Sequence, residues 1–152
     1  MAVTVYAIIG DANTRKSSTA RALTGVGQKK KVDIESMAGT LPAFVQISAL
    51  QESAIAPNEF INHMTTDGHL NAVVTLRDAP LSKGGHTFPS GSAYLREFIN
   101  AGWRIQQVVV LGAPRLAHAL PAGTPGPMYV PGSRSTPTNK IASQIRQSWA
   151  WL

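Results

Sequence analysis

The residues best suited to chemistry lie near the start of the chain, between an apolar run at residues 3–9 and a helix-like segment at 16–24. They are Gly10, Asp11, Ala12, Asn13, Thr14, Arg15, Lys16, Ser17 and Ser18. A glycine-containing turn from a strand into a helix can wrap backbone N–H groups around an anion. Lys16 would bring positive charge to β- and γ-phosphates, and Ser17 would offer its hydroxyl to Mg²⁺. Residues 10–18 are therefore predicted to form a phosphate-binding loop.

This segment resembles the Walker A element of P-loop nucleoside triphosphatases, G-x-x-x-x-G-K-[ST], with one departure. Arg15 stands where the second glycine of that pattern would be. Glycine there indicates a backbone that needs permissive dihedral angles or close approach to phosphate, whereas arginine is itself a good phosphate ligand. Three alternatives stay open. The loop binds a triphosphate with Arg15 as an extra contact, it binds a smaller anion, or it keeps the fold without a ligand.

A second motif, Gln51-Glu52, follows an apolar segment that we expect to form a strand over residues 43–50. Its position resembles a Walker B element, in which Gln51 replaces the aspartate that holds Mg²⁺. Glu52 matches the residue that polarises the attacking water in many ATPases. A polar pair where a strand reaches solvent is the plain alternative.

The resemblance implies catalytic roles for Lys16 and Glu52, Ser17 as the metal ligand, and ATP with Mg²⁺ as the bound species. Guanine specificity has no support, because the pattern N-K-x-D does not follow the last expected strand. Phosphoryl transfer depends on positioning and on metal-assisted charge stabilisation. With both Arg15 and Gln51 departing from the pattern, we expect weak or absent hydrolysis.

The order of apolar segments predicts an α/β fold, specifically a three-layer domain of the P-loop type that spans residues 1–152. Strands are expected at 3–9, 30–36, 43–50, 71–76 and 104–111. The second and third are too close for a helix between them, so they should form an antiparallel hairpin with a turn at 39–42. The result is a mainly parallel five-stranded sheet with one antiparallel strand.

Helices are expected at 16–24, from Pro57 to about Gly68, from about residue 91 to Gly102, and at 138–152 with Thr138 as N-cap. Residues 78–90 read as a loop. Residues 112–137 are rich in proline and glycine and form a longer one, which could close over a ligand as a lid.

The amino-acid composition limits which binding partners and which cellular compartment are expected for this chain. Fourteen basic residues against eight acidic ones give a net charge of +6, which favours anionic partners, nucleic acid among them. The absence of cysteine excludes disulfides and thiolate metal sites. No apolar run approaches the roughly 20 residues of a membrane span, and no secretory pattern opens the chain. A cytoplasmic protein without membrane contact is the expectation.

Several further residues are weaker candidates. Arg77 and Asp78 follow an expected strand end, and Arg115 and Arg134 lie in the long loop. No zinc site is expected from the histidines, which lack a recognised ligand spacing; they are His63, His69, His86 and His118. Trp149 and Trp151 are expected in the core, with docking of a partner as the alternative.

Three functional hypotheses follow, in order of preference. The first is a nucleotide-binding or phosphate-binding P-loop protein with weak or no hydrolysis. The second is a basic, non-enzymatic module that binds nucleic acid or a protein, for which the run Lys29-Lys30-Lys31 offers positive charge. The third is a small-molecule phosphotransferase.

Overall fold

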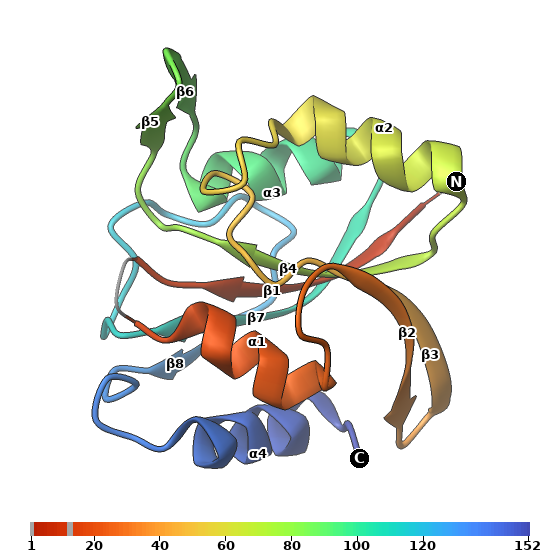
Figure 1. Ribbon diagram of the computed structural model, residues 1–152, viewed down its shortest axis with the longest axis vertical. Helices are drawn as coiled ribbons and strands as arrows, with labels where there is room; N and C mark the ends of the chain where they lie inside the picture. The colour runs from red at the N-terminus through yellow and green to blue at the C-terminus, as the bar shows by residue number, and fades with distance from the viewer. Residues whose placement is uncertain (1, 12–13) are drawn as a thin grey trace.

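A computed structural model describes residues 2–11 and 14–152 (Figure 1), so Ala12 and Asn13 of the predicted loop lie outside the described residues. The chain is an α/β protein with a six-stranded mixed sheet in the order β2-β3-β4-β1-β7-β8. β2 runs antiparallel to β3, and the other neighbours are parallel. The strands of this sheet are β1 (Thr4–Ile9), β2 (Lys30–Ser36), β3 (Gly39–Val45), β4 (Asn71–Leu76), β7 (Arg104–Leu111) and β8 (Met128–Val130).

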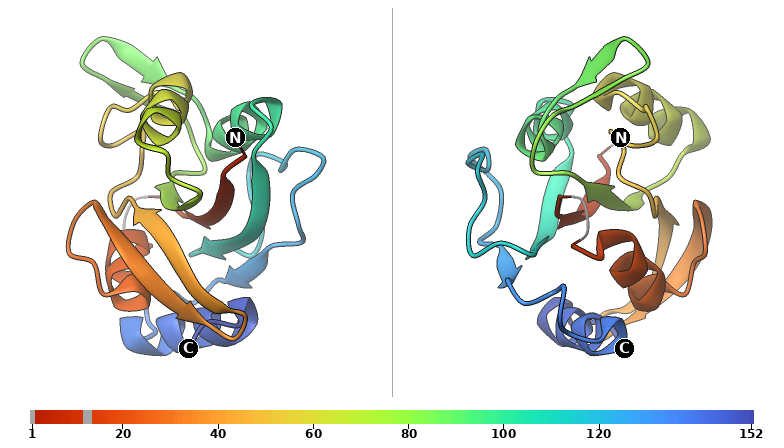
Figure 2. Two further views of the ribbon diagram at one scale, coloured as in Figure 1. Left: turned by 90° about the vertical axis from the view of Figure 1, so that its right-hand side faces the viewer. Right: turned by 60° about the vertical axis from the view of Figure 1, so that its left-hand side comes forward.

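Helices cover both faces of the sheet (Figures 1 and 2). On one face lie α2 (Pro57–Asp67) and α3 (Gly91–Asn100), and on the other lie α1 (Lys16–Thr24) and α4 (Thr138–Trp149). The central strand β1 is apolar on both sides, as a strand between two helical layers must be. Val5, Ala7 and Ile9 join the core under α2 and α3, whereas Tyr6 and Ile8 join the core under α1 and α4.

The hairpin β2–β3 differs from its prediction. β3 occupies Gly39–Val45 rather than residues 43–50, and the turn lies earlier, at residues 37–38. The hydroxyl of Ser36 closes this turn: it donates to the carbonyl of Gly39 at 2.7 Å and accepts from the N–H of Ala38 at 3.2 Å. β3 pairs with β4 only at Phe44 and Val45, so Pro42 lies on an edge, where proline is tolerated.

Residues beyond Val45 leave the strand but still follow β4. The N–H of Gln46 donates to Val73 at 2.8 Å, and the N–H of Leu50 donates to Thr75 at 3.0 Å. The segment between β3 and α2 therefore runs beside β4, toward the carboxyl end of β4. Gln51 and Glu52 reach the edge of the sheet that the sequence predicted for them, although not at the end of a regular strand.

Both predicted loops contain strands. Residues 78–90 include the antiparallel pair β5 (Leu81–Lys83) and β6 (His86–Phe88), which form a small separate sheet. The longer segment contributes β8, which pairs with the end of β7 and makes a sixth strand, so the prediction of five strands was wrong. The N-cap of α4 is Pro137, not Thr138.

The C-terminal tryptophans belong to the core, as expected. Trp149 and Trp151 are both buried, with ring centroids 5.7 and 5.1 Å from the ring of Tyr6.

Among the described residues, no helix combines the length and the apolar character needed to cross a bilayer.

Candidate functional site

The parallel strands β1, β4 and β7 end at one edge of the sheet, on the left of Figure 1, and the chain passes there from β1 into α1. In open α/β sheets this carboxyl edge is where ligands bind. Gly10 begins the connection with its N–H bonded to the carbonyl of Leu76 at 3.0 Å. A Cβ on Gly10 would lie 2.3 Å from Oγ1 of the buried Thr14, so a larger residue at position 10 would displace that side chain.

Thr14 anchors the connection from inside the protein. Its side chain is 2% exposed, and its hydroxyl donates to the carbonyl of Asp11 at 2.7 Å. The carbonyl of Thr14 accepts from the hydroxyl of Ser133 at 2.9 Å. Gly112 completes the fit, because a Cβ there would lie 2.4 Å from a methyl carbon of Thr14. Thr14 therefore links Asp11, beyond the end of β1, to Gly112 and Ser133 of the segment after β7.

Arg15 has a backbone conformation that is uncommon for a residue with a side chain. Its φ of 66° and ψ of 26° lie in the left-handed region, which favours glycine. The exposed side chain reaches the carbonyl of Thr136, at 3.4 Å from Nη1. Arg15 is the N-cap residue of α1, and its side chain makes no capping hydrogen bond to the described residues of the helix. The N-cap side chain thus satisfies none of the N–H groups in the first turn of α1.

The two predicted catalytic residues, 36 positions apart in the chain, meet in an ion pair. Nζ of Lys16 lies 3.1 Å from Oε2 of Glu52, and Nη1 of Arg77 lies 3.5 Å from the same oxygen. Lys16 is only 6% exposed. Lys83 of β5 adds a hydrogen bond from its ammonium to the backbone carbonyl of Glu52. Glu52 is therefore held by three cationic side chains.

Gln51 has a different role from the one its motif position implies. It is fully buried, and its amide nitrogen donates to the carbonyls of Arg77 at 3.0 Å and Pro89 at 3.2 Å. Its amide oxygen accepts from the N–H of Arg77 at 3.1 Å. The side chain thus ties the end of β4 to the segment before α3, and both ends of its amide are engaged.

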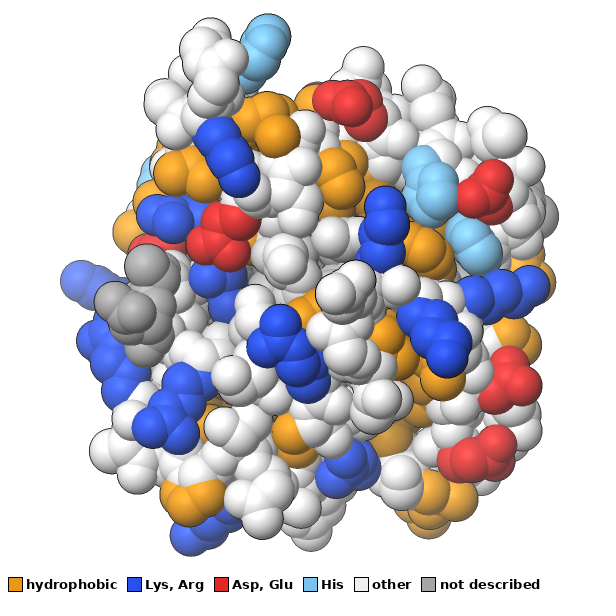
Figure 3. Space-filling model, viewed as in Figure 1, with side chains coloured by type: hydrophobic (Ala, Val, Ile, Leu, Met, Phe, Trp, Pro, Cys, Tyr) orange, Lys and Arg blue, Asp and Glu red, His pale blue; other side chains and the backbone are white. Residues whose placement is uncertain are grey.

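A basic pocket opens over the start of α1. It has a volume of about 500 Å³ and is lined by Arg15, Lys16, Ser17, Ser18 and Arg134. Lysine and arginine side chains gather around this end of α1 in Figure 3. The hydroxyl of Ser17 donates to the carbonyl of Ile47 at 3.3 Å. Gly10 and Asp11 instead line a neighbouring cavity of about 70 Å³, which Arg134 also lines.

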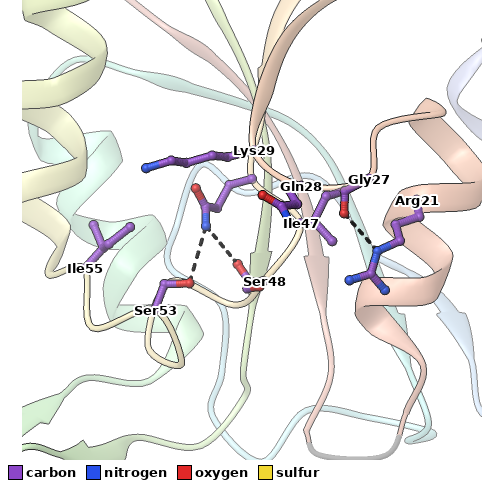
Figure 4. Close-up of a pocket in the computed structure, with 9 residues that line it drawn as sticks. Arg21, Gly27, Gln28, Lys29, Ile47, Ser48, Ser53 and Ile55 are labelled. Atoms are coloured by element: carbon purple, nitrogen blue, oxygen red, sulfur yellow. Dashed lines mark hydrogen bonds between the residues drawn. The ribbon is translucent and has the colours of Figure 1, made fainter.

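A second large pocket lies beside α1, with a volume of about 520 Å³ (Figure 4). Its lining includes Arg21 and Lys29, and none of the described residues that line it carries a carboxylate. Nε of Arg21 donates to the carbonyl of Gly27 at 3.0 Å, and the amide of Gln46 lies 3.4 Å from both the carbonyl of Ser48 and the hydroxyl of Ser53. Basic residues on this face therefore extend beyond residues 10–18.

The other sequence candidates divide into structural and exposed residues. Asp78 is buried and accepts from the N–H of Ala117 at 2.8 Å, so it fixes the long segment after β7. Arg115 and the run Lys29-Lys30-Lys31 are exposed. Ser133 was not among the candidates from the sequence, and Arg134 was named only together with Arg115 as a residue of the long loop. Both are placed by β8, which no local pattern reveals.

Comparisons with protein-family models, with curated proteins and with solved structures find no match to this chain. Its class is therefore defined by what is described above: an α/β protein with a basic pocket at the carboxyl edge of a mostly parallel sheet.

Proposed function

We propose that the chain binds a nucleotide, with ATP favoured, or another phosphate-bearing ligand, over the start of α1 in a P-loop type of domain. The observation that carries the proposal is the left-handed backbone at Arg15, at the position where the Walker A pattern has its second glycine. A turn of that kind aims consecutive N–H groups toward one point, which suits an anion. The positive end of the dipole of α1 acts in the same direction.

The side chains of the pocket support the same ligand chemistry. Arg15, Lys16 and Arg134 all line it, and its lining holds no carboxylate. A nearly buried ammonium such as that of Lys16 needs an anionic partner, and Glu52 provides one here. A phosphate oxygen offers the same charge, so the ligand would compete with Glu52 for Lys16. Ser17, on the pocket wall, would hold Mg²⁺.

Weak or absent hydrolysis belongs to this proposal. The position of the Mg²⁺-holding aspartate carries Gln51, whose amide is fully engaged with backbone groups. Glu52 could orient a water molecule only after its pairs with Lys16 and Arg77 loosen. Phosphate binding needs neither an aspartate at position 51 nor a released Glu52, because it depends on backbone N–H groups and positive charge.

Isothermal titration calorimetry with ATP, GTP and pyrophosphate, each with and without Mg²⁺, tests the proposal. The wild-type chain should bind ATP, and Lys16→Ala should weaken binding about ten- to hundredfold. That range corresponds to a charge-assisted hydrogen bond of about 1.5–3 kcal/mol. Lys30→Ala is the matched control, because Lys30 is an exposed lysine on β2 that lines neither large pocket. It should leave the affinity unchanged.

Absence of heat with every phosphate compound would overturn the proposal. So would binding that Lys16→Ala and Lys30→Ala weaken equally, since that result indicates attraction by net charge alone. Salt-sensitive binding of single-stranded nucleic acid that survives Lys16→Ala would favour the basic-module hypothesis instead. A coupled assay for ADP release should detect no turnover above that of Lys16→Ala.

A further inference from the structure

Two histidines and an aspartate converge at the C-terminal end of α2, far along the chain from the phosphate loop. His63 and Asp67 lie one helical turn apart on α2, and His69 follows the helix. One ligand atom from each residue lies within 4.8 Å of the other two. This cluster plays no part in the proposed nucleotide site.

The end of the helix fixes the third member of the cluster. Gly68 takes a left-handed conformation, with φ of 71°, and reverses the chain direction. The N–H of His69 then bonds back to the carbonyl of Met64 at 3.1 Å, a pattern typical of helix ends. His69 is thereby returned to the face of α2 that carries His63 and Asp67, before the chain enters β4.

Aromatic packing orients both imidazoles. The ring of Phe44 on β3 lies 4.9 Å from the ring of His63 and 5.1 Å from that of His69, between centroids. The two histidine rings are 5.8 Å apart. Ligands whose orientation is fixed by neighbours lose little freedom when they bind.

The shortest separation in the cluster matches that of a metal centre, and the wider ones are within reach of it by side-chain movement. Nδ1 of His63 lies 3.3 Å from Oδ2 of Asp67, and Nε2 of His69 lies 3.9 Å from the same oxygen. In a tetrahedral zinc site, bonds of 2.0–2.2 Å place neighbouring ligand atoms about 3.3–3.5 Å apart. The widest separation in the cluster would need to contract by about 1.5 Å at most.

We propose that His63, Asp67 and His69 form a binding site for a divalent transition-metal ion, with zinc as the ion to test. Imidazole nitrogen and carboxylate oxygen are ligands that zinc accepts, and three protein ligands leave a fourth position for water. The side chains of His63 and Asp67 are 43% and 49% exposed, so the ion and its water have access from solvent. A helical His–Asp pair alone would account for two of these residues; His69 completes the ligand set.

The site would join the end of α2 to the start of β4 and would lie beside β3. Lys31 of β2 lines a cavity of about 180 Å³ together with His69, so its positive charge opposes a bound cation. Replacing Lys31 by methionine should therefore tighten zinc binding, whereas the same change at the exposed Lys140 of α4 should not.

The test uses the full chain, freed of metal with a chelator and then titrated with Zn²⁺ against a fluorescent zinc indicator. One ion should bind per chain, and His63→Gln, Asp67→Asn and His69→Gln should each weaken binding more than about tenfold, since even outer partners of metal ligands contribute about ten- to hundredfold. His86→Gln is the control, because His86 is exposed on β6 outside the cluster. It should bind zinc like the wild type.

Substitution with Co²⁺ gives an independent readout, because a tetrahedral site produces intense visible absorption that hexa-aqua Co²⁺ lacks. Zn²⁺ should also raise the thermal midpoint of the wild type but not of Asp67→Asn, which keeps the shape of the side chain and should fold. Failure of zinc to saturate one site would overturn the proposal. Binding that His69→Gln leaves intact would overturn it equally, since the third ligand would then be irrelevant.

Discussion

The left-handed backbone at Arg15 can be tested without any ligand, by comparing glycine with alanine at this position. A residue with a Cβ in this conformation is less stable than glycine by about 1–2 kcal/mol. Glycine also makes the unfolded chain more flexible, and this lowers the free energy of unfolding by about 0.4–1 kcal/mol relative to alanine. Arg15→Gly should therefore be more stable than Arg15→Ala by about 0.5–1 kcal/mol.

The comparison removes other contributions because both variants lose the same side chain. The exposed contact of Arg15 with the carbonyl of Thr136, at 3.4 Å, disappears in each. Arg21 is the matched control, an exposed arginine inside α1 with right-handed backbone. There the order should reverse, with Arg21→Gly about 0.8–1 kcal/mol less stable than Arg21→Ala.

Urea denaturation at equal slopes gives the four free energies of unfolding. The left-handed conformation at position 15 would be refuted if Arg15→Ala had the same free energy of unfolding as Arg15→Gly, while Arg21→Gly was less stable than Arg21→Ala as expected. The phosphate-loop proposal would then lose the observation that carries it. In calorimetry, Arg15→Gly should still bind ATP, because it keeps the N–H groups and removes only the guanidinium.

Three further predictions concern stability. Gln51→Asp should lower the free energy of unfolding by about 2–3 kcal/mol in urea denaturation and should not create ATP hydrolysis, because a carboxylate cannot donate to the carbonyls of Arg77 and Pro89. Gly91→Ala should cost about 1–3 kcal/mol in the same assay, since a Cβ would lie 2.6 Å from the carbonyl of Arg77. The pKa of His69 lies below its usual value of 6.5, mainly because burial disfavours the charged imidazole. Below pH 6.5 the His69 side chain therefore binds fewer protons in the folded chain than in the unfolded chain. In the presence of chelator, the free energy of unfolding should fall as the pH drops from 6.5 through that lowered pKa, and His69→Gln should reduce this loss.

Much of the fold could be predicted because its signals are local. β7 and α1 have the bounds that the sequence predicted, β7 through its apolar run and α1 through Gly25, whose left-handed backbone ends the helix. The meeting of Lys16 with Glu52 was also within reach of the sequence. Lys16 follows β1, and Glu52 follows a segment that runs along β4, and the carboxyl ends of these two parallel strands share an edge of the sheet.

The missed features depend on contacts between distant segments. β8 has three residues and exists because it pairs with Val109–Leu111 at the sheet edge, which nothing within residues 112–137 indicates. Arg134 reaches the basic pocket, and Ser133 reaches Thr14, only because β8 places them there. The clustering of His63, Asp67 and His69 was not predicted for a different reason: His69 comes near the other two only because Gly68 reverses the chain.

The two departures from the P-loop pattern are physically unequal. Arg15 changes the side chain but has the left-handed backbone that glycine readily adopts, so this departure leaves the proposed anion site its backbone requirement at position 15. Gln51 changes the chemistry itself. Its amide donates to two carbonyls that an ionised aspartate would repel, and the packing between β4 and α3 has formed around those bonds. We therefore expect binding and turnover to separate in this chain. Lys16→Ala should weaken phosphate binding about ten- to hundredfold. No substitution at Gln51 alone should produce hydrolysis, because the residue at the metal-positioning site of the pattern instead ties the end of β4 to the segment before α3.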